Sequence, residues 1–235
     1  MIYLVVSATF FMAIHLLIAG TTVRDRLIDA FGETFYLLAF SGLSVAGIVW
    51  LVASYNHAAI EDTWLVWDFG PGVRHLGGLI MLVASLFAVM GLLTPNPTAV
   101  GGGEVLKSDD PARGMVRITR HPFLWGAAIW AGFHLVANGD AASIVFFGTF
   151  LVLSILGTVS IDSKRRRGYG EAWARFSAKT SNIPFGAIIT RRNSLNLEEI
   201  GLWRLAAATA VFLAILLSHA WLFGVSPFPG GWVPF

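Results

Sequence analysis

Six apolar runs dominate the sequence and limit the folds open to it. Most of them approach the ~20 residues that a helix needs to cross a bilayer core. Only 13% of the 235 residues are charged and 56% are hydrophobic, whereas soluble domains carry roughly 25% charged residues. We therefore expect a single all-α domain over residues 1–235, a polytopic membrane bundle of about six helices. The predicted spans are 1–20, 35–55, 75–94, 121–138, 141–161 and 202–225.

The Lys and Arg residues fall almost entirely in alternate loops. Segments 21–34, 95–122 and 162–204 hold 15 of the 16 basic residues, and only Arg74 lies on the opposite side. The positive-inside rule then predicts that these segments are cytoplasmic and that both termini lie outside a bacterial-type inner (plasma) membrane. The basic charge indicates topology and contact with membrane lipids, so nucleic acid is not needed to explain it.

The basic and aromatic stretch after the fifth run, residues 160–185, has a different pattern. We expect part of it to form a cytoplasmic amphipathic helix before the last span. Such a helix would lie on the inner leaflet with Trp173 and Phe176 buried.

Histidines are the main ionisable residues inside the predicted spans. The spans contain His15, His75, His134 and His219, and no Asp, Glu, Lys or Arg lies clearly at mid-span. This argues against a proton-coupled transporter or an ion channel. Two neutral imidazoles from different helices suit axial ligation of a haem iron. The alternative is an imidazole bonded to backbone, hydroxyl groups or water, which we favour for His219.

The sequence Arg120-His121-Pro122 marks the start of the fourth predicted helix, because proline suits the first helical position. Its Arg and His could meet a phosphate or an anionic cofactor at the helix N-terminus. His134 follows His121 by a rise of about 20 Å and about 140° around the axis. These two histidines therefore belong to different sites.

Several stretches together resemble the NnrU family, which includes the 15-cis-ζ-carotene isomerase of plants and cyanobacteria. They are "RITRHP" from Arg117, His134, "YGEAWARFSAKTSNIPFGAI" from Tyr169, "GETF" from Gly32 and "PGVRH" from Pro71. The resemblance implies a multi-pass protein with a redox role that binds haem b. It maps the two iron ligands onto His15 and His134, and we keep His75 as a substitute because its predicted depth matches that of His134.

The same resemblance implies two kinds of activity. One is cis–trans isomerisation of a carotenoid or other apolar substrate, and the other is nitric oxide chemistry linked to denitrification, with an unidentified redox partner. In the isomerase, a cysteine three residues before the second histidine is proposed to exchange with an axial ligand. Here that position is Ala131, and the chain has no cysteine, which argues against the same ligand exchange.

A second resemblance is to isoprenylcysteine carboxyl methyltransferase and related membrane methyltransferases. It implies an S-adenosylmethionine site at Arg120 and His121, with Gly126 and Tyr169 as further framework residues. The acidic pair of those enzymes maps onto Ile161–Asp162, where one acid is missing. We interpret this as shared fold more than shared activity. A non-catalytic membrane assembly factor is the remaining alternative.

Overall fold

The computed structural model describes residues 1–231, and helices are its regular elements. The last four residues of the predicted domain, 232–235, lie outside the described part. The longer elements are α1 (Ile2–Ala13), η1 (Ile14–Ile18), α2 (Thr22–Phe31), α3 (Glu33–Glu61), α4 (Arg74–Leu93), α6 (Pro122–Ala137), α7 (Ala141–Lys179) and α10 (Leu202–Phe223). The short ones are η2 (Pro71–Val73), η3 (Gly102–Lys107), α5 (Met115–Ile118), α8 (Gly186–Ile189), α9 (Leu197–Ile200) and η4 (Pro229–Gly231).

The all-α membrane architecture is confirmed, with four or five candidate spans by length and composition where about six were expected. Four helices are long and apolar enough to cross a membrane, namely α3, α4 with η2, α7 and α10. A fifth span is possible if α1–η1 and α2 count together, although they are bent by 78°. Helix α6 has 16 residues, about 24 Å, which is less than the ~30 Å of a hydrocarbon core.

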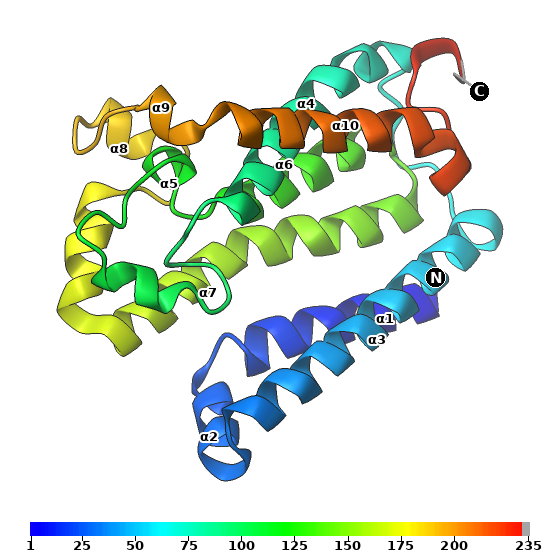
Figure 1. Ribbon diagram of the computed structural model, residues 1–235. Helices are drawn as coiled ribbons and strands as arrows, with labels where there is room; N and C mark the ends of the chain where they lie inside the picture. Colours follow the sequence, from blue (N-terminus) through cyan, green and yellow to red (C-terminus); the bar gives the residue numbers. More distant parts are fainter. Residues whose placement is uncertain (232–235) are drawn as a thin grey trace.

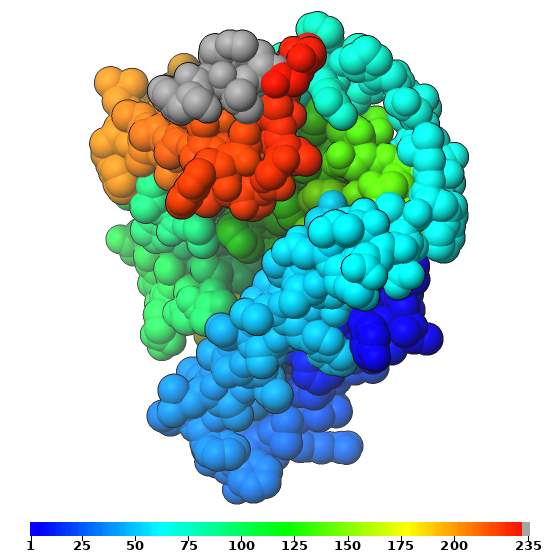
Figure 2. Space-filling view, turned by 90° about the vertical axis from the view of Figure 1, so that its right-hand side faces the viewer, coloured from blue at the N-terminus to red at the C-terminus, as the bar shows by residue number. Residues whose placement is uncertain are grey.

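Helix α7 occupies the middle of the bundle. Helices α1 and α3 pack on one side of it and α6 on another, while α4 packs against both α6 and α10 (Figure 1). The α1–α3 part, coloured blue, forms a lobe of its own beside the rest (Figure 2). We call it the N-terminal lobe (residues 2–61). Its contact with α7 is an apolar core that includes Leu4, Phe11, Phe146 and Phe147.

Small residues let α4 and α6 approach closely. A Cβ placed on Gly126 would lie 2.5 Å from the backbone nitrogen of Ala88, and one on Gly91 would lie 2.9 Å from Pro122. Such contacts are typical of packed membrane helices, where close backbone approach replaces the hydrophobic driving force.

The ends of α6 and α7 follow from local sequence. Pro122 is the first residue of α6 after His121, as the Arg-His-Pro sequence predicts. The side chain of Asp140 accepts a hydrogen bond from the Ser143 N–H at 2.9 Å and caps α7. The Asn138–Asp140 turn therefore joins the two helices as a hairpin.

Helix α7 does not end at residue 161, where its apolar run ends. It continues to Lys179 through a non-helical Gly170, with φ 46° and ψ −114°. Its last part is the segment that we expected on the inner leaflet. Trp173 and Phe176 are buried as predicted, but their contacts are with the protein, in a core that includes Leu106 and Val116.

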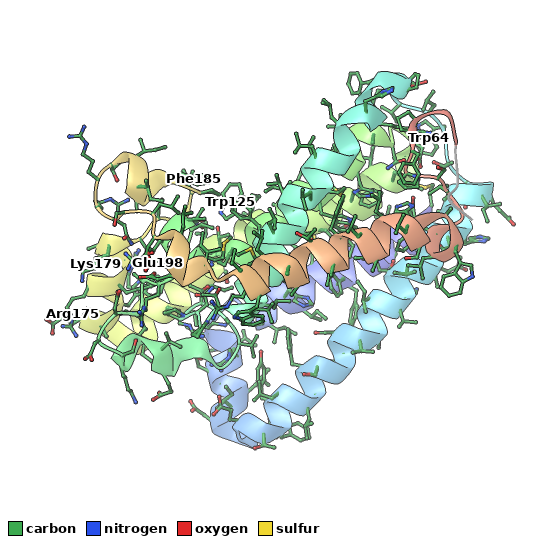
Figure 3. The ribbon with its side chains drawn as sticks, turned by 45° about the horizontal axis from the view of Figure 1, so that its top comes forward. Trp64, Trp125, Arg175, Lys179, Phe185 and Glu198 are labelled. Carbon is green, nitrogen blue, oxygen red and sulfur yellow. The ribbon has the colours of Figure 1, made fainter. Side chains whose placement is uncertain are left out.

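The two ends of the bundle differ in chemistry. Figure 3 shows Trp125, Arg175, Lys179, Phe185 and Glu198 gathered at one end and Trp64 at the other. We call the first the basic end, because the basic loops of the sequence meet there.

Candidate functional site

The arginine and the histidine of the Arg-His-Pro sequence share a single carboxylate at the basic end. Nε of Arg120 donates to both oxygens of Asp162, at 2.9 and 3.0 Å, and its Nη2 donates to the second oxygen as well. Nε2 of His121 lies 2.7 Å from Oδ1 of the same Asp162 carboxylate. His121 is only 2% exposed and Asp162 8%. Both side chains are therefore engaged within the protein, and the S-adenosylmethionine site expected here stays a prediction.

The backbone of Arg120 is also held in place. Its carbonyl accepts hydrogen bonds from the Thr98 hydroxyl at 2.6 Å and from the Asn96 amide at 3.3 Å. Its N–H donates to the carbonyl of Ser181 at 2.9 Å. These bonds fix the loop before α6 against two segments that are distant in sequence.

A second ionic cluster at the basic end was not expected from the sequence. Arg117 binds both carboxylate oxygens of Glu199 at 2.7 Å and the side chain of Asn193 at 2.6 Å. The N–H of Gly114 donates to the same carboxylate at 2.9 Å. The hydrogen bond and charge of Arg117 lower the pKa of Glu199 to about 2. Arg117 and Glu199 are 82 residues apart, and a single sequence does not show that two such distant charges form a pair.

His15 lies in η1, two residues beyond the end of α1. Its Nδ1 lies 2.8 Å from the carbonyl oxygen of Phe11, and its ring contacts those of Phe11 and Phe40 at 4.4 and 5.2 Å. A carbonyl can only accept, so Nδ1 carries the proton. Nε2 then has its lone pair free, which is the form of histidine that binds metals.

His134 in α6 has the same arrangement. Its Nδ1 donates to the carbonyl of Trp130 at 2.9 Å. The ring stacks on Phe147 of α7 with centroids 4.9 Å apart and lies 5.3 Å from the indole of Trp130. Its Nε2 therefore also has a free lone pair.

The depth of His134 follows from the packing of α6 on α7. The two helices are antiparallel, with Gly132 facing Leu151 and Gly148 facing Leu135. The backbone of His134 is thus level with that of Thr149.

The depth of His15 follows in the same way. Helix α1 is parallel to α7, because the Phe11 and Phe150 rings are 5.9 Å apart and the Ser160 hydroxyl donates to the carbonyl of Gly20. This places the His15 backbone level with Ile155.

Measured along α7, the backbones of the two histidines are therefore about 9 Å apart, which is the rise of six helical residues. Their side chains reduce this difference. Each imidazole leans toward the N-terminus of its own helix, as helical side chains do, and bonds four residues back. Because α1 and α6 run in opposite directions, the two rings lean toward a common depth along α7, where Phe150 contacts both Phe11 and Trp130. No direct contact joins the two rings.

His75 and His219 lie at the opposite end from the basic loops. His75, the proposed substitute ligand, is exposed in the first turn of α4. Nδ1 of His219 donates to the carbonyl of Val225 at 2.8 Å, a backbone partner of the kind expected for it. Among residues 1–231, no three His, Asp or Glu side chains are grouped so as to hold a metal ion.

These features define a multi-pass helical membrane protein with an ionic cluster at one end and two histidines on helices that pack against a central helix. Residues 3–227 match the family described as NnrU protein. The chain belongs to the NnrU family, as the sequence resemblance predicted.

Two curated relatives are chloroplastic 15-cis-zeta-carotene isomerases. The protein from Zea mays is 28% identical over 169 residues, which cover 70% of this chain and 44% of the relative. The protein from Arabidopsis thaliana is 25% identical over 216 residues, which cover 87% and 56%. The chain thus spans about half the length of these relatives. No solved structure matches it.

Proposed function

We propose that this chain binds one haem b between α1 and α6, with His15 and His134 as the axial ligands. The observation that carries the proposal is the hydrogen bond from each Nδ1 to the carbonyl four residues earlier. Such a bond fixes the tautomer and the orientation of an iron-binding imidazole and raises its basicity. Two histidines with this bond lean toward one depth, on helices that both pack on α7.

The surroundings also suit a flat apolar macrocycle. Phe11, Phe150 and Trp130 form a series of ring contacts between the two histidines, with centroid distances of 5.9 and 5.5 Å. These rings keep water and charge away from the imidazoles, so the neutral form of each histidine is favoured.

When bound, haem would supply a redox-active iron, for electron transfer or for contact with nitric oxide or an apolar polyene. The chain itself contributes two oriented imidazoles and an apolar enclosure. It contributes no thiolate ligand, because it has no cysteine and Ala131 stands three residues before His134. We therefore propose imidazole ligation only, in a membrane protein whose role is redox or isomerase in type.

The absorption spectrum of the purified protein tests this proposal. Protein from haem-replete cells should show a Soret band and, when reduced, split α and β bands. His134→Ala and His15→Ala should each lose or strongly alter these bands, because each removes one ligand. His219→Ala is the matched control, since its Nδ1 also donates to a backbone carbonyl but from α10, and its spectrum should be unchanged. A colourless wild-type protein from such cells would exclude haem binding.

A further inference from the structure

An apolar pocket of about 150 Å³ lies inside the bend between α1 and α2. Its walls come from η1, α2 and α3 and include Ile18, Leu27, Phe35, Tyr36 and Ala39. An apolar cavity of this size can hold a benzene-sized hydrocarbon group. The pocket can therefore receive a segment of an acyl chain but not a charged group by itself.

One residue of the pocket wall, Tyr36, carries a buried hydroxyl without a partner. Tyr36 is 7% exposed, and its hydroxyl makes no hydrogen bond with any described residue. A buried hydroxyl left unpaired costs roughly 1–3 kcal/mol, so such groups normally have a partner. A ligand with an oxygen atom at this point would provide one.

Two basic residues, Arg24 and Lys164, bring positive charge to the region of the bend. The guanidinium of Arg24 lies over the Tyr36 ring, 5.5 Å from its centroid, and it also pairs with Asp25, whose side chain is half-exposed, and with the exposed Glu33. Lys164 of α7 follows by one helical turn the Ser160 that bonds to Gly20 in the bend. The basic C-terminal part of α7 therefore lies beside the bend that holds the pocket.

Lys164 is the unusual member of this group. It is half-buried, and no ion pair or hydrogen bond to its ammonium group is found among the described residues. The charges that act on it are those of Arg24, Arg165 and Arg167, with Asp25 as the one acidic contribution. A half-buried ammonium group with this excess of positive neighbours attracts an anion.

We propose that an anionic phospholipid binds here, with its phosphate at Arg24 and Lys164, an ester oxygen at the Tyr36 hydroxyl and part of an acyl chain in the pocket. The three observations fit one amphipathic molecule, because Tyr36 belongs to the apolar lining, carries the unpaired hydroxyl and has the Arg24 guanidinium over its ring. A free phosphate would leave the pocket and the hydroxyl without a partner. The pocket borders His15, since Ile14 and Phe40 belong to its lining and the Phe40 ring contacts that of His15, but the proposed lipid contacts use neither haem ligand.

Native mass spectrometry of the full chain, released from nanodiscs, tests the charge requirement. Phosphatidylglycerol should be retained several-fold better than phosphatidylcholine with the same acyl chains. Lys164→Ala should weaken phosphatidylglycerol binding about fivefold, from ~1 kcal/mol per basic residue near the membrane surface. Arg166→Ala is the matched control, because Arg166 is exposed two residues away, and its affinity should not change. Equal retention of the two lipids, or equal effects of the two variants, would overturn the proposal.

Pocket variants test the lipid tail and the hydroxyl separately. Ala39→Trp, which fills the pocket, should abolish selective retention, whereas Ala53→Trp on an exposed part of α3 should not. Tyr36→Phe keeps the packed ring and removes only the hydroxyl, so a weaker affinity in this variant cannot reflect misfolding. Excess inorganic phosphate should fail to displace the lipid. Displacement by phosphate, or unchanged affinity in both Ala39→Trp and Tyr36→Phe, would exclude a phospholipid site.

Discussion

A single carboxylate, that of Glu199, ties two segments of the basic end together, one that contains Gly114 and Arg117 and its own. It accepts hydrogen bonds from Arg117 next to α6, from the Gly114 N–H and from the Asn196 side chain in the segment before α10. A bidentate Arg–carboxylate pair is geometrically specific as well as strong. Because Glu199 is one residue from Ile200 at the end of α9, the pair fixes the approach of the chain to α10.

We expect Glu199→Gln to lower the free energy of unfolding at pH 7 by about 1.5–3 kcal/mol, the typical value of a hydrogen bond to a charged group. The folded pKa of Glu199, about 2, lies below its ordinary value of 4.5. Its stabilising effect is therefore complete above pH 4.5 and is lost as the pH falls toward 2. Thermal unfolding in detergent at pH 7 and at pH 3 should show the difference between wild type and variant shrinking at the lower pH.

Glu198→Gln provides the control for this experiment. Glu198 is the exposed neighbour in the same short helix, so its replacement should change stability little at either pH. If Glu199→Gln and Glu198→Gln behaved alike, the Arg117 pair would not contribute to stability.

At the level of helices, the closest packing is that of α4 on α6. Gly126→Ala should destabilise the protein by about 1–3 kcal/mol, the usual cost of overpacking a filled interface. The added Cβ would lie 2.5 Å from the Ala88 nitrogen and 2.7 Å from the Ala84 carbonyl oxygen, both in the backbone of α4. A helix backbone cannot move away as a side chain can, so α4 and α6 must separate. The midpoint of thermal unfolding measures the effect.

Gly78→Ala is the matched comparison, because a Cβ at Gly78 would have nothing within 4 Å. Alanine is favoured over glycine inside a helix by about 1 kcal/mol. Gly78→Ala should therefore be neutral or slightly stabilising. A Gly126→Ala protein as stable as Gly78→Ala would contradict close packing at this interface.

Hydropathy predicts the helices well but not where all of them end. The limits of α4 and α6 lie within one residue of their apolar runs, because proline or a turn closes each run. Helix α7 extends 18 residues beyond the predicted 161, to Lys179. The extension is rich in Lys, Arg, Glu and Ala, which favour helices but are invisible to a search for apolar runs.

The candidate site is predictable in part, for a similar reason. Ionisable groups are rare within or next to membrane spans. Residue type alone therefore identifies four candidate site residues in the sequence, namely His15, His134, Arg120 and His121. Their partners depend on tertiary contacts, and Asp162 meets Arg120 across 42 residues. The bonds of the two histidines to carbonyls four residues back also require coordinates, since many histidines in helices do not make them.

At the scale of the whole molecule, the distribution of charge predicts an orientation in the membrane. The loops rich in Lys and Arg converge on one end of the bundle, and Trp64 lies at the other (Figure 3). An asymmetry in short basic loops is the main signal that orients membrane proteins. We therefore predict that the basic end faces the cytoplasm and that the loop after α3 faces outward.

The absence of cysteine makes this orientation measurable, because one introduced cysteine is the only thiol in the chain. Glu61→Cys and Ser194→Cys place a thiol at exposed positions of opposite ends. In intact spheroplasts of a bacterial host, a membrane-impermeant maleimide should label Glu61→Cys and should label Ser194→Cys only after lysis. The reverse pattern would invert the topology and would place the Arg24–Lys164 cluster at the outer leaflet. Labelling of both before lysis would mean that the basic end is not shielded by the membrane, and the positive-inside argument would fail for this protein.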